Sequence, residues 1–236
     1  MSGKCNQLFD NKQRIIHCLL LNAPFMSCIG LLNGKMGIVL AFYIYYRHTD
    51  CKIYEEFADD LLNNTLECID NDIDFSFSNG LAGIGWGIEY LIQRGFVAGT
   101  GEEICEDIDK KIMETDPRRI LDFSLDTGLE GLLHYVLIHI SASVKQNIQL
   151  PFDEMYLKDL YTVLKQVCQK KDVCNSFKTL SDIYIDFIEK QQEIVYPLDI
   201  YSFINIDMFD VDKIMSYPLN LKCGLAGLLL KKYTNG

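Results

Sequence analysis

The chain has 236 residues, a net charge of −11 and a pI near 4.8, and 49% of its residues are apolar. This length and composition suit one globular domain with a sizeable core and argue against a disordered chain. The charge argues against a nucleic-acid binder, because such proteins carry a basic stripe and the lysines and arginines here form isolated pairs.

The chain carries no signal for a membrane. No apolar run reaches the roughly 18 residues that span a bilayer, and the N-terminus lacks the pattern of a signal peptide. The nine cysteines are odd in number and widely spaced, which is typical of a reducing compartment. We expect a cytoplasmic, acidic protein that binds neither nucleic acid nor membrane and that attracts a basic peptide.

The predicted elements are helices separated by polar or glycine-rich loops. In chain order they span residues 9–21, 32–48, 52–70, 79–94, 101–114, 127–141, 151–170, 175–192, 207–217 and 223–233. Helices 79–94 and 127–141 are apolar on nearly every side, whereas 52–70 and 101–114 are amphipathic and suit an outer layer. Strand signals are weak, and only 196–206 has the composition of a short strand.

A Gly-x-x-Gly motif recurs where loops turn into apolar helices. The pairs are Gly34 and Gly37, Gly80 and Gly83, Gly128 and Gly131, and Gly224 and Gly227. Their first members are 46, 48 and 96 residues apart, so a degenerate copy is expected at Ser176. A helical hairpin repeated at this period cannot bury its own apolar face, and neighbouring hairpins must therefore stack.

The glycines have two explanations, which are compatible. Glycine tolerates a positive φ and lets another backbone or helix come close. The helix N-termini would also converge on one rim, where free N–H groups favour an anion or a carbonyl. We predict an all-α, single-domain α/α toroid over residues 1–236, with about five helical hairpins and the glycine-led helices inside. An open solenoid is the alternative.

The repeated motif resembles the lanthionine synthetase C-like family. The resemblance is clearest at Asn79-Gly80-Leu81-Ala82-Gly83-Ile84-Gly85 and spans residues 31–230. It implies an α/α barrel whose two concentric helix layers surround a cavity. The chain is shorter than family cyclases, which have more hairpins. Those cyclases bind one zinc and add a peptide cysteine thiolate across a dehydrated Ser or Thr.

The family's zinc ligands come from Trp-Cys-x-Gly in one repeat and Cys-His-Gly in the next, and such catalysis needs three protein ligands. Here Trp86 precedes Gly87 instead of a cysteine, and no histidine follows a cysteine. Cys174 and Cys223 occupy ligand-like positions, but the third ligand is missing. We therefore expect no cofactor, and zinc is the alternative that these two cysteines would support. They are more simply small residues at crowded junctions.

The candidate catalytic residues are Glu89, Asp126, Glu130 and His134. Paired carboxylates would suit glycoside hydrolysis, which α/α toroids also host. Asp126 is more simply an N-cap, and the helix dipole explains Glu130. Glu89 lies in an apolar helix, where a buried carboxylate needs a partner, such as His134 or Tyr135.

The sequence thus predicts a lanthionine synthetase C-like protein of peptide modification or maturation, with its zinc ligands lost. This leaves its enzymatic activity open. One alternative is a non-catalytic scaffold that binds a peptide or a partner protein. The other is a carbohydrate-active toroid that uses paired carboxylates.

Overall fold

The computed structural model describes residues 2–70, 72–170, 173–190, 194–206 and 210–234. Every regular element within them is helical, which confirms the all-α prediction. The α-helices are α1 (Ser2–Asn22), α2 (Lys35–Thr49), α3 (Lys52–Glu67), α4 (Leu81–Gln93), α5 (Gly101–Met113), α6 (Leu129–Gln146), α7 (Glu154–Val167), α8 (Asn175–Lys190) and α9 (Leu225–Tyr233). None of these described helices is long and apolar enough to cross a membrane.

Four short 3-10 helices complete the described elements: η1 (Ala23–Phe25), η2 (Pro117–Arg119), η3 (Ile200–Phe203) and η4 (Val211–Ser216). The segment 196–206, the only one whose composition suits a short strand, forms none: residues 196–199 belong to no regular element and η3 follows them. The helix expected over 207–217 is a 3-10 helix where it is described, and residues 207–209 lie outside the described part.

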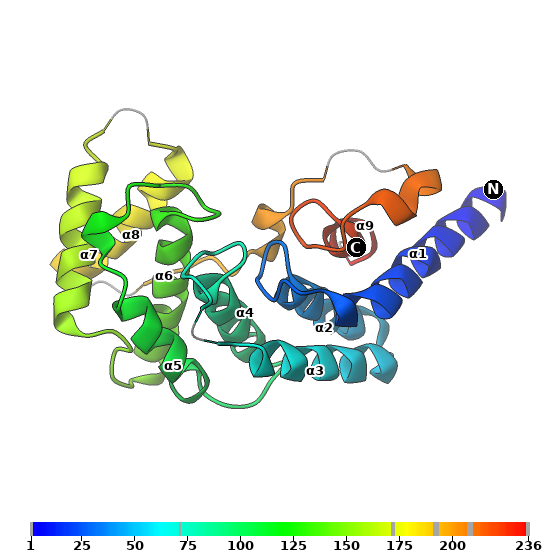
Figure 1. The fold of residues 1–236 in the computed structure, drawn as a ribbon, viewed down its shortest axis with the longest axis horizontal. Coiled ribbons are helices and arrows are strands. Elements are labelled where there is room, and N and C mark those ends of the chain that lie inside the picture. The colour runs from blue at the N-terminus through cyan, green and yellow to red at the C-terminus, as the bar shows by residue number, and fades with distance from the viewer. Residues whose placement is uncertain (1, 71, 171–172, 191–193, 207–209, 235–236) are drawn as a thin grey trace. The chain divides into compact units, whose positions relative to one another are not determined.

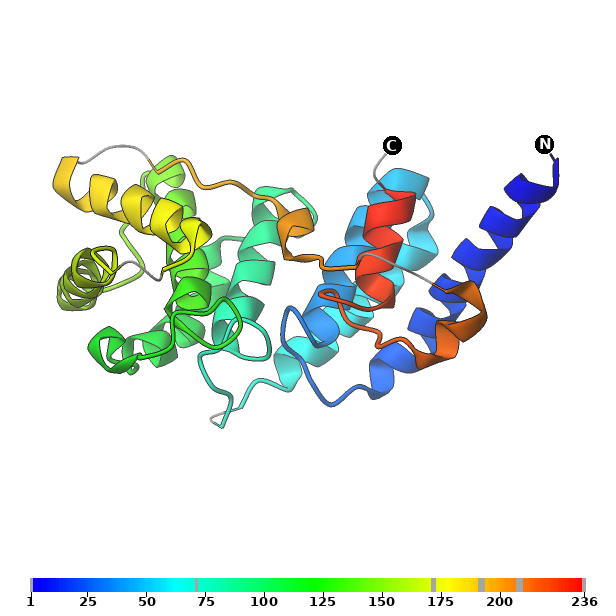
Figure 2. The same cartoon turned by 90° about the horizontal axis from the view of Figure 1, so that it is seen from above.

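The chain divides into two compact units, one formed by residues 1–72 and 199–236 and the other by residues 73–198. In the first unit, α2 packs against α3 and α9, and α1 packs against α9 (Figure 1). In the second, α4 packs against α5 and α6, while α8 packs against α6 and α7 (Figure 2). The last glycine-led helix thus lies beside the first, as a ring requires. Ring closure and the single domain stay predictions.

The glycine-led helices are the buried ones. All residues of α4 from Leu81 to Leu91 are buried, and so are residues 35–43 of α2. By contrast, α5 buries only one stripe and exposes its acidic side. The sequence-based division into inner apolar helices and outer amphipathic helices is therefore confirmed within each unit.

The four Gly-x-x-Gly junctions share one backbone geometry. The first glycine of each pair is the N-cap of its helix, with φ between −125° and −112° and ψ near −160° to −165°. The residue after it donates its N–H to the carbonyl seven positions earlier, as Leu81 does to Asp74 (2.9 Å) and Leu225 does to Pro218 (2.8 Å). The loop therefore wraps back over the glycine.

This wrapping explains why glycine is needed. A Cβ at Gly128 would lie 2.5 Å from the Asp122 carbonyl oxygen, and one at Gly34 would lie 2.6 Å from the Cys28 carbonyl oxygen. Real Cβ atoms do not approach backbone that closely. The expectation that these glycines provide a positive φ is wrong, whereas the expectation of close backbone approach is confirmed.

Neighbouring junctions meet at equivalent positions. The N–H of Ser78 donates to the Asp126 carbonyl (2.9 Å), and the N–H of Lys222 donates to the Leu32 carbonyl (3.0 Å). Each of these four residues stands two places before an N-cap glycine. Within each unit, two glycine-led helices thus begin at a shared rim, as the repeat predicts.

The degenerate fifth junction departs from this pattern. Helix α8 begins at Asn175, so Ser176 lies inside its first turn instead of at the N-cap position. The carbonyl of Cys174 accepts the N–H of Lys178 (3.2 Å), which marks Cys174 as the residue that precedes the helix. The fifth junction therefore lacks the N-cap glycine of the other four.

Candidate functional site

A buried network of charged side chains joins three helices of the second unit. Glu89 lies on α4, Asp109 on α5 and His139 on α6, and all three are at most 4% exposed. Nδ1 of His139 contacts Glu89 Oε1, and its Nε2 lies 2.9 Å from Asp109 Oδ2. The hydroxyl of Tyr135 donates to Asp109 Oδ1 (2.5 Å). Gln93 donates to the second oxygen of Glu89 (3.3 Å).

This network fixes the charge of its histidine. Burial alone would lower the pKa of His139, but hydrogen bonds with Asp109 and Glu89 and their negative charges overcome this effect and raise it to about 9. His139 is therefore an imidazolium between two carboxylates at neutral pH. The carboxylate of Glu89 packs closely against the backbone of Gly101, because a Cβ at Gly101 would overlap this carboxylate.

One member of the network reaches a surface groove. Asp109 lines an open groove of about 590 Å³ together with Glu102, Glu103, Glu106, Lys110, Met113, Gln149, Leu150 and Pro151. Glu102 and Glu103 belong to the first turn of α5, where the helix dipole favours negative charge. The single cation, Lys110, is held by Glu106 (2.7 Å). We call this feature the acidic groove, and the buried residue Asp109 is one of those that line it.

The structure corrects the partner expected for Glu89. That partner is His139, not His134 or Tyr135: His139 lies five residues after His134 on α6, on a different face, and it contacts Glu89 of α4 and Asp109 of α5. The sequence did contain a signal for Asp109: it lies four residues after Cys105 on the buried stripe of α5, where a carboxylate must have a partner.

His134 lies in a second polar chain. The indole Nε1 of Trp86 donates to the Tyr196 hydroxyl (2.8 Å), which lies 2.5 Å from Nδ1 of His134. Indole only donates, so the Tyr196 hydroxyl accepts from it, and the direction of its bond with His134 depends on the tautomer of the ring. Burial lowers the pKa of His134 to about 3, which agrees with a neutral ring. His134 therefore ties the segment around Tyr196 to α4 and α6.

Asp126 is not an N-cap, which corrects the expectation for this residue. The N-cap of α6 is Gly128, and Asp126 contributes its backbone carbonyl to the rim contact with the 77–78 segment. Asp122 is the carboxylate that organises this loop. It accepts the Ser124 N–H (2.9 Å), the Ser124 hydroxyl (2.8 Å) and the Thr127 hydroxyl (2.6 Å). The Thr127 and Ser124 hydrogen bonds lower the pKa of Asp122.

Glu130 and Cys174 are brought together. Glu130 lies in the first turn of α6, where the dipole favours it, and its carboxylate accepts from the hydroxyl of Ser176 at the start of α8. The thiol of Cys174 lies 3.5 Å from the second oxygen of Glu130 and 3.2 Å from the Ser176 hydroxyl. This buried carboxylate therefore joins the third junction to the degenerate one.

A comparison with protein families agrees with the repeated junctions. The family model described as "Lanthionine synthetase C-like protein" matches residues 28–173, which is more than half of the chain.

The chain belongs to the lanthionine synthetase C-like family.

No curated protein and no solved structure matches the chain. The family match covers α2 to α7, and therefore three of the four intact junctions, the buried network and the acidic groove. It ends just before Cys174, so the two candidate zinc ligands lie outside the matched part.

The zinc that the family resemblance implies does not fit the residues present. Cys174 has Glu130 and Ser176 as its polar neighbours, and Cys223 has Asn220, whose side-chain oxygen lies 3.7 Å from the thiol. The two cysteines belong to different units. Among the described residues, no group of three or more His, Cys, Asp or Glu side chains could hold a metal ion. We therefore derive no chemical step through zinc.

Proposed function

We propose that this lanthionine synthetase C-like protein binds a peptide with basic side chains in the acidic groove. The observation that carries the proposal is the groove itself, which three exposed glutamates line together with the buried Asp109. Such a surface attracts cations and repels anionic partners. The net charge of −11 adds a long-range attraction for the same ligands.

The buried network supports binding more readily than catalysis. His139 is fully buried and both of its ring nitrogens are engaged, so it has no free position with which to reach a substrate. Its role is to hold Asp109 in place and to compensate the buried negative charge. A peptide-binding scaffold is therefore preferred to peptide modification of the cyclase type.

Glycoside hydrolysis, the carbohydrate alternative, is disfavoured because Glu89 is not available as a catalytic carboxylate. Glu89 is 1% exposed, its carboxylate is bound to His139, and it does not line the acidic groove. A glycosidase needs two carboxyl groups that both reach the scissile bond. Glu89 would have to leave its partners before it could take part in such chemistry.

The binding proposal is tested with a fluorescein-labelled lysine-containing peptide, whose anisotropy is followed as protein is added. We expect saturable binding that weakens as salt rises from 50 to 300 mM, because these charges are screened. A glutamate-for-lysine peptide of the same length should not bind. Equal binding of both peptides would contradict the proposal.

A pair of charge-reversed variants locates the binding site. The groove variant carries Glu102→Lys, Glu103→Lys and Glu106→Lys, and the matched control carries Glu56→Lys, Asp60→Lys and Glu67→Lys on the exposed side of α3. Both change the net charge equally. We expect the groove variant to bind at least about tenfold more weakly, since each exposed pair contributes up to roughly 1 kcal/mol. An equal loss in the control would show that only net charge matters.

A further inference from the structure

A smaller pocket beside α7 carries an inference about which side chain the peptide presents. Its volume is about 180 Å³, and Met113 lines both this pocket and the acidic groove. Asp116 and Arg118 come from the segment at η2, and Met155, Tyr156 and Asp159 come from α7. We call it the α7 pocket.

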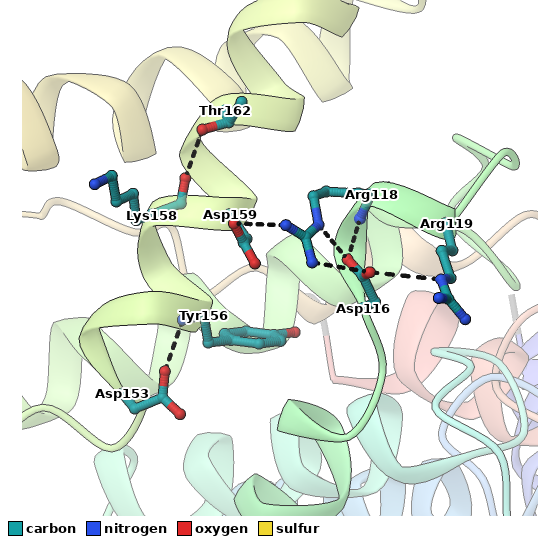
Figure 3. A network of polar contacts seen from close by, with 8 residues as sticks. All are labelled: Asp116, Arg118, Arg119, Asp153, Tyr156, Lys158, Asp159 and Thr162. Atoms are coloured by element: carbon teal, nitrogen blue, oxygen red, sulfur yellow. Dashed lines mark hydrogen bonds and ion pairs between the residues drawn. The ribbon is translucent and has the colours of Figure 1, made fainter.

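The hydroxyl of Tyr156 is a buried polar group that lacks a hydrogen-bond partner among the described residues. Tyr156 is 5% exposed, and its backbone N–H is used by the N-cap Asp153 (2.6 Å). Its ring extends from α7 toward the segment that carries Asp116 (Figure 3). Leaving such a hydroxyl unsatisfied is unfavourable, so a ligand that restores a hydrogen bond would bind with advantage.

The charges around the pocket select a cation. Arg118 is the only basic residue among those that line the pocket, and its guanidinium is already paired with carboxylates. It donates to Asp116 through Nε (2.8 Å) and Nη2 (3.1 Å) and to Asp159 Oδ1 through Nη1 (3.3 Å). Glu114 and Asp153 also line the pocket, so carboxylates outnumber cations and an anionic ligand is repelled.

Asp159 uses one of its carboxylate oxygens, Oδ1, to accept from Arg118. Asp159 follows Tyr156 by three residues on α7, which places both side chains on one face of the helix. Figure 3 shows Arg118 on one oxygen of Asp159 and the other oxygen turned toward the Tyr156 ring. Both residues line the α7 pocket, so a donor group bound there lies beside Asp159 and Tyr156.

We propose that the α7 pocket receives the ammonium group of a lysine side chain. The ammonium donates to Asp159 and Tyr156, and the aliphatic stem packs against Met113, Met155 and the tyrosine ring. A compact ammonium suits two acceptors on one wall, whereas a guanidinium requires a bidentate carboxylate and one oxygen of Asp159 is already used. The identity of the ligand as part of a peptide rests on the proposed function.

The pocket is tested with n-butylammonium, which reproduces the stem and charge of lysine. Methionine methyl groups labelled with ¹³C report binding by NMR, because Met113 and Met155 line the pocket and the fully buried Met36 of the other unit serves as a control. We expect saturable shifts at Met113 and Met155 and none at Met36. Equal shifts with n-butyrate, or no shifts at all, would overturn the proposal.

Two variants separate binding from folding. Tyr156→Phe removes the unsatisfied hydroxyl, so it should unfold at the same temperature or higher while it binds butylammonium about tenfold more weakly. Asp159→Asn keeps the shape and should weaken binding to a similar extent. Full butylammonium affinity in a folded Tyr156→Phe protein would overturn the assignment.

The inference and the proposed function fail in different ways. Replacing the peptide lysines with norleucine one at a time should identify one position whose loss weakens anisotropy binding as Tyr156→Phe does. If the peptide binds the acidic groove but butylammonium leaves Met155 unchanged, the lysine pocket is refuted and groove binding stands. If butylammonium binds but reversal of the groove charges leaves peptide affinity unchanged, the pocket stands and the groove proposal is refuted.

Discussion

Replacing His139 with leucine tests the buried network most directly. The imidazolium compensates Glu89 and Asp109, and its removal leaves two carboxylates buried without a cation. Breaking a buried ion pair in this way typically costs about 3–5 kcal/mol. The shift in the pKa of His139 from 6.5 to about 9 corresponds to about 3 kcal/mol, so two independent arguments give the same order of magnitude.

The same shift predicts how stability depends on pH. The folded protein keeps a proton on His139 between pH 6.5 and about 9, where the unfolded chain has lost it. The stabilisation is therefore fully present below pH 6.5 and is lost as pH rises through about 9. His134 acts in the opposite direction. Because burial lowers its pKa to about 3, stability falls as pH drops below 6.5.

The measurement is urea unfolding followed by circular dichroism between pH 5 and pH 9.5. We expect His139→Leu to be less stable by about 3–5 kcal/mol at pH 6.5 and to lose the decrease toward pH 9. His134→Leu is the matched control: it should keep the alkaline decrease and lose the acidic one. A loss below about 1 kcal/mol in His139→Leu, or an unchanged alkaline decrease, would refute the network as a source of stability.

Three further predictions concern the junctions and the metal. Gly128→Ala should lower the free energy of unfolding by roughly 1–3 kcal/mol, because its Cβ would meet the Asp122 carbonyl. The control Lys145→Ala, at an exposed position, should change this free energy by less than about 0.5 kcal/mol. Equal losses of stability in urea unfolding would contradict the packing argument. Asp122→Ala should cost about 1–2 kcal/mol at pH 7, since the carboxylate accepts its hydrogen bonds in the charged form. The cost should shrink as acid protonates this carboxylate, whose pKa is lowered, and a pH-independent cost would argue against this role. Protein purified without chelators should contain well below one equivalent of zinc by elemental analysis, and a full equivalent that is lost in Cys174→Ser or Cys223→Ser would overturn the fit argument.

The glycine junctions show which structural features a local sequence pattern predicts. The 48-residue spacing located all four glycine-led helices, because a glycine pair before an apolar run is a local requirement that recurs in each repeat. The reason for the glycines was harder to read. Spacing does not reveal φ, so only the structure showed extended glycines beneath a wrapped loop.

The candidate site residues show which contacts a local sequence pattern does not predict. Glu89 could be identified because a carboxylate in an apolar helix must find a partner. Which partner it finds depends on the rotation of α6 against α4 and α5, and this rotation selects His139 instead of His134. The acidic groove and the α7 pocket were not predicted, since they combine side chains from separate elements.

The sequence by itself determined the helical class, the inner and outer layers and the family, because helix periodicity and the glycine repeat are properties of neighbouring residues. Tertiary structure alone decided that Asp109, His139 and Glu89 share one charge network and that the Tyr156 hydroxyl has no hydrogen-bond partner among the described residues. The physical reason is distance along the chain. Glu89 and His139 are fifty residues apart, and their contact depends on how three helices pack, which no local pattern encodes.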